Sequence, residues 1–381
     1  MKQAKRMRRI LALIAVLAVV MVACGDDDAA TTTTAATTTT AGVTTTAAET
    51  TTTEPAPVYV DFNGDGQVLI GVATDGPRDD GAYYQSLVDK VIEISTENGF
   101  ADPIIVDLID PANAEAELRN IAEQGVDILA VGSSAIGEPL PTLLAEFPDI
   151  FWYCNCGSGY PVTEGLLISL DRGAELWISG GYAAGLLMQE RGGTAAAFLG
   201  CCDLDFEKES FNAFVYGLQL VDPTFTATYT PTGNFAFDFN NTQGATEAFN
   251  SALGTDGLAV VVPFLGGAHE PIVQLANDND LIVMSAGSSA ACERTDLAYD
   301  FEVKFSTGDY VDPLFADIIS GAALEGTART FRVGIDEEVG AEFCASATAE
   351  QVAALAELNA AIGAGEYDEV INGIVADAYG F

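Results

Sequence analysis

Short apolar runs alternate with longer amphipathic stretches from Val68 onwards. Ten runs have the length and the nearly continuous apolar character of buried strands: Val68–Ala73, Ile104–Leu108, Ile128–Gly132, Ile150–Tyr153, Leu166–Leu170, Ala195–Leu199, Phe225–Tyr229, Leu258–Val262, Leu281–Ser285 and Phe301–Phe305. The stretches between them predict helices at roughly 81–98, 112–124, 138–146, 174–190, 208–220, 241–252, 268–278 and 309–325. Strands that are apolar at nearly every position are covered on both faces, so the alternation predicts parallel α/β sheets.

The number of strands sets the domain organisation. Ten strands over about 320 residues are more than one hydrophobic core comfortably holds. The sequence therefore predicts an α/β fold of two doubly wound parallel-sheet lobes. We expect residues 58–172 to form the N-terminal lobe, completed by about 283–308, and residues 173–282 to form the C-terminal lobe, completed by about 309–381.

The first 57 residues differ in composition from the rest. A basic start at 2–9 and an apolar run at 10–22 have the layout of an export signal, and the run is too short to span a bilayer well. Small residues lead into Cys24 as in a bacterial lipobox, so we predict a signal peptide at 1–23 and acylation of Cys24; an ordinary secretory signal cleaved nearby is the alternative. Thr and Ala dominate 24–57, which predicts a lipid-anchored disordered linker. The expected location is the extracytoplasmic face of the cell membrane, with the lipid anchor as the only membrane contact.

Charge and histidine content exclude several functions. The chain has 15 Lys and Arg against 56 Asp and Glu, a formal charge of −41, whereas a nucleic-acid backbone requires a basic surface. The single histidine, His269, leaves no histidine-rich zinc site. Residues 61–66 match the opening of a calcium loop, but position 12 is Val72 and not Glu, so we interpret them as a polar turn. We predict neither a metal nor a cofactor.

Four of the predicted strands run into polar, glycine-rich loops. These loops are Asp75–Gly81, Cys154–Gly157, Pro263–Gly267 and Ala286–Ser289. In wound sheets a ligand lies outside the carboxyl ends of the strands, and helix starts behind glycines present free N–H groups to oxygen-rich ligands. The pattern predicts a site for an oxygen-rich small molecule at the carboxyl ends of these strands.

Three segments in order and spacing carry a family resemblance. They are Val72–Gln85, with its Asp75-Gly76 and Asp79-Asp80-Gly81-Ala82-Tyr83, then Leu176–Leu186 and Phe211–Gly217. Over roughly residues 68–334 the chain resembles the basic membrane protein family of ABC-transporter substrate-binding lipoproteins, which includes purine-nucleoside receptors. The resemblance implies a type I periplasmic binding protein fold, in which two lobes are joined by a hinge of three crossing segments and close on a ligand.

The same resemblance implies roles for individual residues. Asp75 and Asp80 would accept hydrogen bonds from the ligand, and Tyr83 would stack on a base. Asn155 stands where the family commonly has Asp. The other implied ligand-binding residues are Phe235 or Phe237 as a second aromatic, Gly266 and Gly267 as the glycine loop, and Lys304 as a contact to a sugar. The family's Gly-Val-Asp-x-Asp run is here 284–288, so Ser288 replaces only part of the carboxylate that would hold ribose hydroxyls.

Six cysteines remain once Cys24 is set aside: 154, 156, 201, 202, 292 and 344. Export favours disulfides over metal thiolates, although six cysteines allow 15 connectivities. The pairs 154/156 and 201/202 both follow strands and would pair with each other or within themselves. A bond between Cys292 and Cys344 would pin the C-terminal segment. A site of four thiolates is the alternative.

These observations predict a solute receptor without enzymatic activity. We expect a monomer that binds a small polar molecule, with a nucleoside as the favoured candidate, and delivers it to an ABC permease in the membrane. A nucleoside-hydrolysing enzyme is one alternative, with Asp75, Asp79 and Asp80 as its nearest approach to a catalytic cluster. A surface receptor that senses its ligand is the other.

Overall fold

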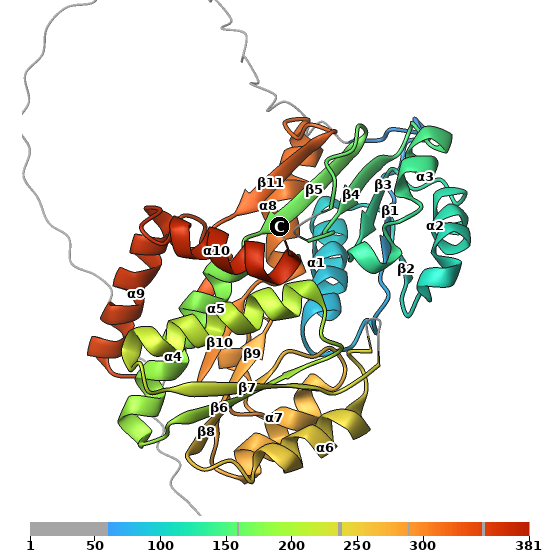
Figure 1. The fold of residues 1–381 in the computed structure, drawn as a ribbon. Helices are drawn as coiled ribbons and strands as arrows, with labels where there is room; N and C mark the ends of the chain where they lie inside the picture. Colours follow the sequence, from blue (N-terminus) through green and yellow to red (C-terminus); the bar gives the residue numbers. More distant parts are fainter. Residues whose placement is uncertain (1–59, 158–159, 235–237, 289, 345–346, 381) are drawn as a thin grey trace, which may run out of the picture. The chain divides into compact units, whose positions relative to one another are not determined.

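A computed structural model describes residues 60–380, apart from 158–159, 235–237, 289 and 345–346. Cys24, the linker, Phe235 and Phe237 lie outside the described residues. Figure 1 shows two β-sheets in this part of the chain, each covered by helices. None of the helices described has both the length and the apolar character needed to cross a bilayer.

The first sheet has six strands in the order β11-β5-β4-β3-β1-β2, and each neighbouring pair is parallel. The strands are β1 (Ile70–Ala73), β2 (Ile104–Val106), β3 (Ile128–Val131), β4 (Phe151–Cys154), β5 (Leu166–Asp171) and β11 (Thr327–Phe331). Successive side chains of a strand point to opposite faces, so two apolar layers form. Helices α1 (Tyr83–Asn98) and α8 (Thr307–Ser320) cover one face, and α2 (Ala114–Ala122) and α3 (Leu140–Glu146) cover the other.

The second sheet repeats this arrangement. Its order is β12-β10-β9-β8-β6-β7, with β12 antiparallel to β10 and the other pairs parallel. The strands are β6 (Ala195–Gly200), β7 (Thr226–Pro231), β8 (Leu258–Pro263), β9 (Ile282–Ala286), β10 (Phe301–Lys304) and β12 (Gly340–Phe343). Helices α4 (Gly173–Arg191) and α5 (Asp205–Val221) cover one face, and α6 (Thr242–Ala252) and α7 (His269–Asp278) cover the other. The predicted fold of two wound α/β lobes is confirmed.

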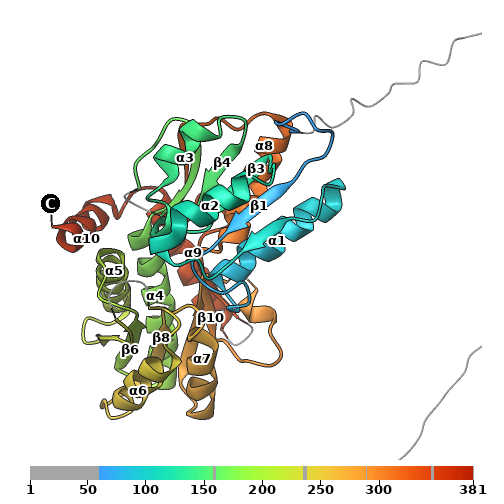
Figure 2. The same cartoon turned by 90° about the vertical axis from the view of Figure 1, so that its right-hand side faces the viewer.

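The chain crosses between the two sheets three times, at residue 172, at 305–306 and at 332–339. Figure 2 shows the two lobes one above the other, with α4 below β4 and β1. Glu175 is fully buried beside two of the crossings: its Oε1 accepts from Nε and Nη2 of Arg332 at 3.1 and 2.6 Å. Nη1 of Arg172 lies 2.7 Å from the same oxygen, and the backbone N–H of Val333 donates to Oε2. One carboxylate thus binds the first and third crossings together.

Of the two return segments, only the part from β12 onwards belongs to the lobe that we predicted. We expected residues 283–308 to complete the first lobe, but β9 and β10 lie in the second sheet. We expected residues 309–381 to complete the second lobe, but most of α8 and all of β11 belong to the first. The apolar pattern identifies strands without naming their partners, and here β9 pairs with β8 through Val260 and Ile282 before the chain crosses.

Close packing of α4 against α5 explains two of the glycines. A Cβ on Gly181 would lie 2.1 Å from the carbonyl oxygen of Phe214, and one on Gly217 would lie 2.2 Å from that of Ile178. The two backbones approach so closely that only hydrogen fits between them. This contact fixes α4, which carries part of the site described below.

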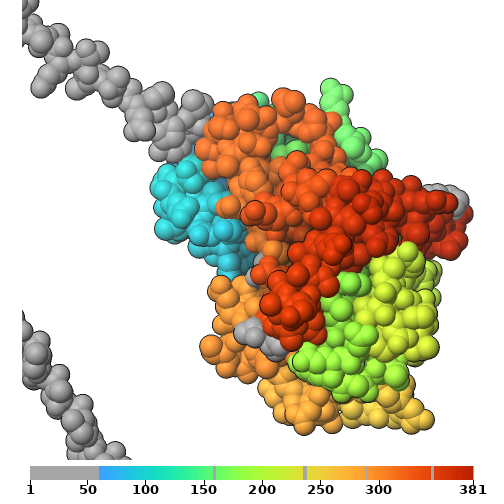
Figure 3. Space-filling view, turned by 90° about the vertical axis from the view of Figure 1, so that its left-hand side faces the viewer, coloured from blue at the N-terminus to red at the C-terminus, as the bar shows by residue number. Residues whose placement is uncertain are grey.

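Four elements were not predicted: β11, β12, α9 (Ala349–Gly363) and α10 (Asp368–Tyr379). Helix α9 packs on α4 and β12, and α10 packs on α5. In Figure 3 the red C-terminal helices lie against the green α4–α5 region and the orange segment that precedes them. They therefore cover the crossing region from one side.

Candidate ligand pocket

A cavity of about 210 Å³ lies where the carboxyl ends of the two sheets face each other. It is slightly smaller than the usual pocket for a drug-sized ligand. Both sheets have the order 2-1-3-4-5 in their core, so the crevices beside β1 and β6 are topological switch points, where ligands bind in open α/β sheets. The lining comes from both lobes: Asp75, Tyr83, Tyr84, Ser133, Ser134, Asn155, Cys156, Gly157, Asp171, Gly173, Leu176, Trp177, Phe206, Glu209, Ser210, Phe239, Phe264, Leu265, Gly266, Ala286 and Phe305.

Four residues singled out from the sequence line this cavity: Asp75, Tyr83, Asn155 and Gly266. Three of them follow the ends of β1, β4 and β8, and Tyr83 begins α1, so the strand-end rule brings them together. Their roles in ligand binding stay predictions.

The remaining described candidates lie outside the lining. Asp80 is buried and accepts from the backbone N–H groups of Ala82, Tyr84 and Gln85, so its carboxylate caps the start of α1. Lys304 pairs with Glu342 at 3.1 Å.

Gly267 and Ser288 complete this set. The backbone N–H of Gly267 donates to Oδ1 of Asn240 at 2.7 Å, and Ser288 is partly buried after β9.

The carboxylate of Asp75 is held by two hydroxyl groups. Its Oδ1 accepts from Oγ of Ser133 at 2.6 Å and from the phenol of Tyr84 at 2.9 Å. Gly76 leaves room for that ring, because a Cβ there would lie 2.2 Å from Cε2 of Tyr84. Burial raises the pKa of Asp75, while the two hydroxyl hydrogen bonds lower it in part. The group is a positioned acceptor facing the cavity.

Asn155 supplies an unused donor. Its side chain is 2% exposed, and Nδ2 has no hydrogen-bond partner among the described residues. A buried amide nitrogen without a partner costs stability, so such a group in a cavity wall indicates a missing acceptor. An oxygen or ring nitrogen of a ligand would satisfy it.

Two further carboxylates in the lining were not predicted. Asp171 ends β5 and accepts from the phenol of Tyr310 at 3.1 Å; burial is the main cause that raises its pKa to about 6. Glu209 lies on α5 and accepts from the backbone N–H of Ala174 at 2.7 Å. Burial and then the charge of Asp171 raise the pKa of Glu209. Asp171 follows a strand end and could have been found by the rule used for Asp75, whereas no sequence signal marks Glu209.

An aromatic wall forms the other side of the cavity, with Phe264 at its centre. Its ring centroid lies 5.0 Å from that of Trp177 and 6.0 Å from that of Phe305. Phe206 and Phe239 lie at 6.0 and 6.4 Å from the same ring. Tyr83 extends the wall, with its ring 6.3 Å from Phe305. Such a wall buries a flat or apolar body.

The three disulfides join Cys154 to Cys156, Cys201 to Cys202 and Cys292 to Cys344. Each strand-end pair thus bonds within itself, which was one of the two arrangements left open. The Cys292–Cys344 bond also forms and ties the segment after β12 to the segment after β9.

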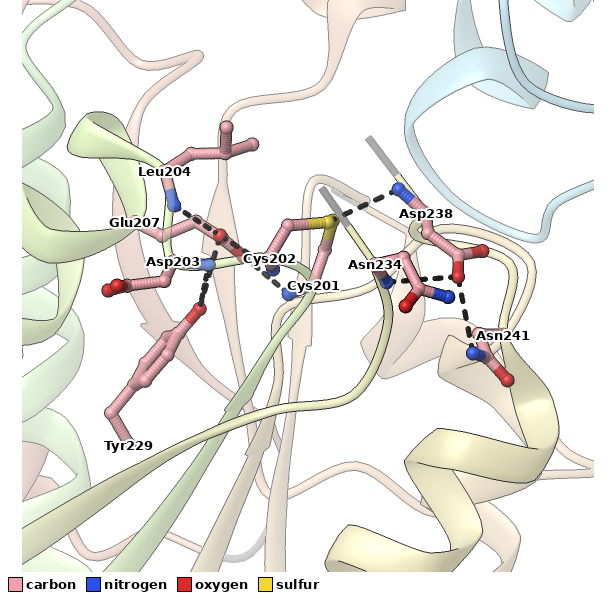
Figure 4. The surroundings of a disulfide bond; sticks show 9 residues. All are labelled: Cys201, Cys202, Asp203, Leu204, Glu207, Tyr229, Asn234, Asp238 and Asn241. Carbon is pink, nitrogen blue, oxygen red and sulfur yellow. Dashed lines mark hydrogen bonds between the residues drawn. A yellow bond between two sulfur atoms is a disulfide. The ribbon is translucent and has the colours of Figure 1, made fainter. Parts of the chain in front are cut away.

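The Cys201–Cys202 pair is held by a buried glutamate (Figure 4). Glu207 accepts from the backbone N–H groups of Cys201, Cys202 and Leu204, and from the phenol of Tyr229. On the other side, the backbone N–H of Asp238 donates to Sγ of Cys202 at 3.2 Å. The neighbours Phe206 and Phe239 line the cavity, so this cluster fixes part of the aromatic wall.

The chain is similar to several solved protein structures. An ABC-transporter solute-binding protein from Conexibacter woesei is 21% identical, with a TM-score of 0.62 and coverage of 78% of this chain and 97% of that one. One from Aeropyrum pernix is 15% identical, with a TM-score of 0.64 and coverage of 81% and 98%. A transcriptional activator from Bacillus halodurans is 15% identical, with a TM-score of 0.62 and coverage of 78% and 98%.

No protein-family model matches the sequence, and no curated protein sequence matches it. At these identities the likeness establishes the fold: the described lobes have the fold of ABC-transporter solute-binding proteins.

Proposed function

We propose that the chain is the extracytoplasmic solute-binding lipoprotein of an ABC importer. The observation that carries this proposal is a cavity between two lobes whose wall combines an aromatic face, positioned acceptors and the unpartnered Nδ2 of Asn155. The two structural neighbours named as ABC-transporter solute-binding proteins support it.

The geometry suits capture without chemistry. Asp75 and Asn155 come from one sheet, whereas Phe264 and Glu209 come from the other lobe, so a molecule between them contacts both. Contacts to both lobes favour the closed arrangement, because only that arrangement makes them all at once. Closure removes water from the ligand, and a membrane permease then receives it.

The ligand of this proposal is a small polar molecule with a flat or apolar part. A nucleoside is the case that the sequence resemblance favours, with its base on Tyr83 and its donors on Asp75. Acylation of Cys24 would hold the protein at the membrane, and residues 24–57 would act as its tether.

The first test is to identify small molecules released from purified full-length protein by mass spectrometry, together with a thermal-shift screen of nucleosides, sugars and amines. Tyr83→Ala should weaken binding of the identified ligand at least about tenfold through lost ring contact. Ser320→Ala, at an exposed hydroxyl outside the lining, is the control. If no molecule is released and no compound shifts the melting temperature, the proposal fails.

Anchoring has a separate test. Cys24→Ala should move the protein from the membrane fraction to the soluble fraction of a host that acylates lipoproteins. Equal membrane retention of both forms would remove the lipid anchor from the proposal.

Ligand sensing is a second candidate, because the Bacillus halodurans neighbour is named as a transcriptional activator. Co-purification from native membranes separates the two. A permease and an ATPase support import, and a histidine kinase supports sensing.

A further inference from the structure

The charge of the pocket is one-sided. Three carboxylates, those of Asp75, Asp171 and Glu209, lie in the lining, and no Lys, Arg or His is among the described lining residues. Electrostatic interactions between buried groups are stronger than those in bulk water. The lining therefore repels anions, and no cationic side chain among the described lining residues balances its negative charge.

The partners of these carboxylates are neutral. Asp75 is bonded by two hydroxyls, and Asp171 by the phenol of Tyr310. Glu209 accepts from a backbone N–H, and a hydrogen bond with Tyr379 lowers its pKa slightly. None of these contacts cancels a full charge.

The guanidinium of Arg172, which follows Asp171 in the sequence, is already paired. Arg172 lowers the pKa of Glu209 as a minor cause, but its Nη1 lies 2.7 Å from Glu175 and 3.2 Å from Asp368. Burial raises the pKa values of all three lining carboxyls, which is the cost of a charged group without a cation. A cation in the cavity would remove that cost.

The aromatic wall strengthens the same preference. Trp177, Phe264 and Phe305 line the same cavity as the carboxylates, and the faces of aromatic rings attract positive charge. A neutral polyol gains little from this wall, and an anion is disfavoured by it. An ammonium group on an apolar or flat body satisfies the rings and the carboxylates together.

We infer that the ligand of this pocket is a small organic cation, an amine or quaternary ammonium compound whose positive group lies near Asp171 and Glu209. The inference rests on the proposed function and narrows it from any small polar solute to one charge class. The apolar body lies against Phe264, and a polar acceptor on that body meets Nδ2 of Asn155.

The test uses purified full-length protein and pairs of probes that differ only in charge. The pairs are choline with 3,3-dimethylbutan-1-ol, and tyramine with 2-(4-hydroxyphenyl)ethanol; adenosine and benzoate represent neutral nucleosides and anions. Titration calorimetry at low salt should show the cation of at least one pair binding at least about tenfold more tightly than its neutral partner. Benzoate should show no binding.

Variants locate the effect. Glu209→Gln and Asp171→Asn should each weaken binding of the cationic probe about tenfold and leave the affinity for its neutral partner unchanged. Glu357→Gln is the control, because it makes the same change in net charge on the exposed face of α9, outside the lining.

The possible outcomes distinguish a failure of the cation inference from a failure of the proposed solute-binding function. Suppose that adenosine or another neutral probe binds and that no cation binds more tightly than its neutral partner. The inference of a cationic ligand is then wrong, while the solute-binding proposal stands. A released natural ligand that is neutral or anionic leads to the same conclusion. Failure of every probe, together with the absence of any released molecule, overturns the solute-binding proposal and the cation with it.

Discussion

Glu175 offers the sharpest test of how the lobes are joined. Its carboxylate is fully buried and bonded to Arg332, Arg172 and the backbone of Val333, so Glu175→Gln removes a charge from the contact between two crossings. Breaking a buried ion pair by removing one partner costs about 3–5 kcal/mol. Both arginine side chains are 27% exposed and can regain some hydration, which places the expected loss near the lower end of that range.

Thermal and urea unfolding measure this loss. About 3 kcal/mol corresponds to a fall in melting temperature of about 4–5 °C for roughly 320 folded residues. Glu357→Gln, on an exposed face of α9, should change the melting temperature by less than about 1 °C. If Glu175→Gln were as stable as this control, the carboxylate would not be joining the crossings, and the account of the hinge given above would be wrong.

Three other substitutions test separate parts of the structure. Replacing Cys292 and Cys344 together by Ala should lower the free energy of unfolding by about 4 kcal/mol, since the bond closes a loop with a sequence separation of 52, and urea unfolding without reductant measures this loss. Gly217→Ala should cost about 1–3 kcal/mol by forcing α4 from α5, whereas Gly373→Ala, with open space around its Cβ, should not destabilise. The pKa of Asp171 is raised to about 6, so between about pH 4 and pH 6 the folded state keeps a proton that the unfolded state releases. The ligand-free wild type should therefore lose stability relative to Asp171→Asn as the pH rises through this range. If the difference in unfolding free energy between these two proteins did not change with pH, Asp171 would not have a raised pKa.

Most of the fold was readable because buried parallel strands leave continuous apolar runs. The elements that were missed lack that signal. In β11 only Phe331 is buried and the other positions are exposed or intermediate, and β12 is a four-residue antiparallel edge strand. Helix α9 did carry a local signal, since Thr348 and Gln351 form a capping box at its start.

The site was less readable for a different reason. Residues at strand ends, such as Asp75 and Asn155, can be placed from the topology alone. Glu209 and Phe206 reach the cavity only because α5 is pressed against α4 at glycine contacts, and nothing in a single sequence reports that approach. Asp80 and Asp75 look alike in the sequence. The carboxylate of Asp80, however, accepts hydrogen bonds from backbone N–H groups, whereas Asp75 lines the cavity.

The late position of β11 and α8 in the chain has a consequence for biogenesis. When synthesis has passed β5, the first sheet still lacks the strand that pairs with its edge and the helix that covers part of its apolar face. An open parallel edge beside uncovered apolar residues favours aggregation while the chain is being made. A nascent chain that stops before residue 307 would therefore expose its aggregation-prone surface in the lobe that was made first. A chaperone would be needed most at β5 and α1.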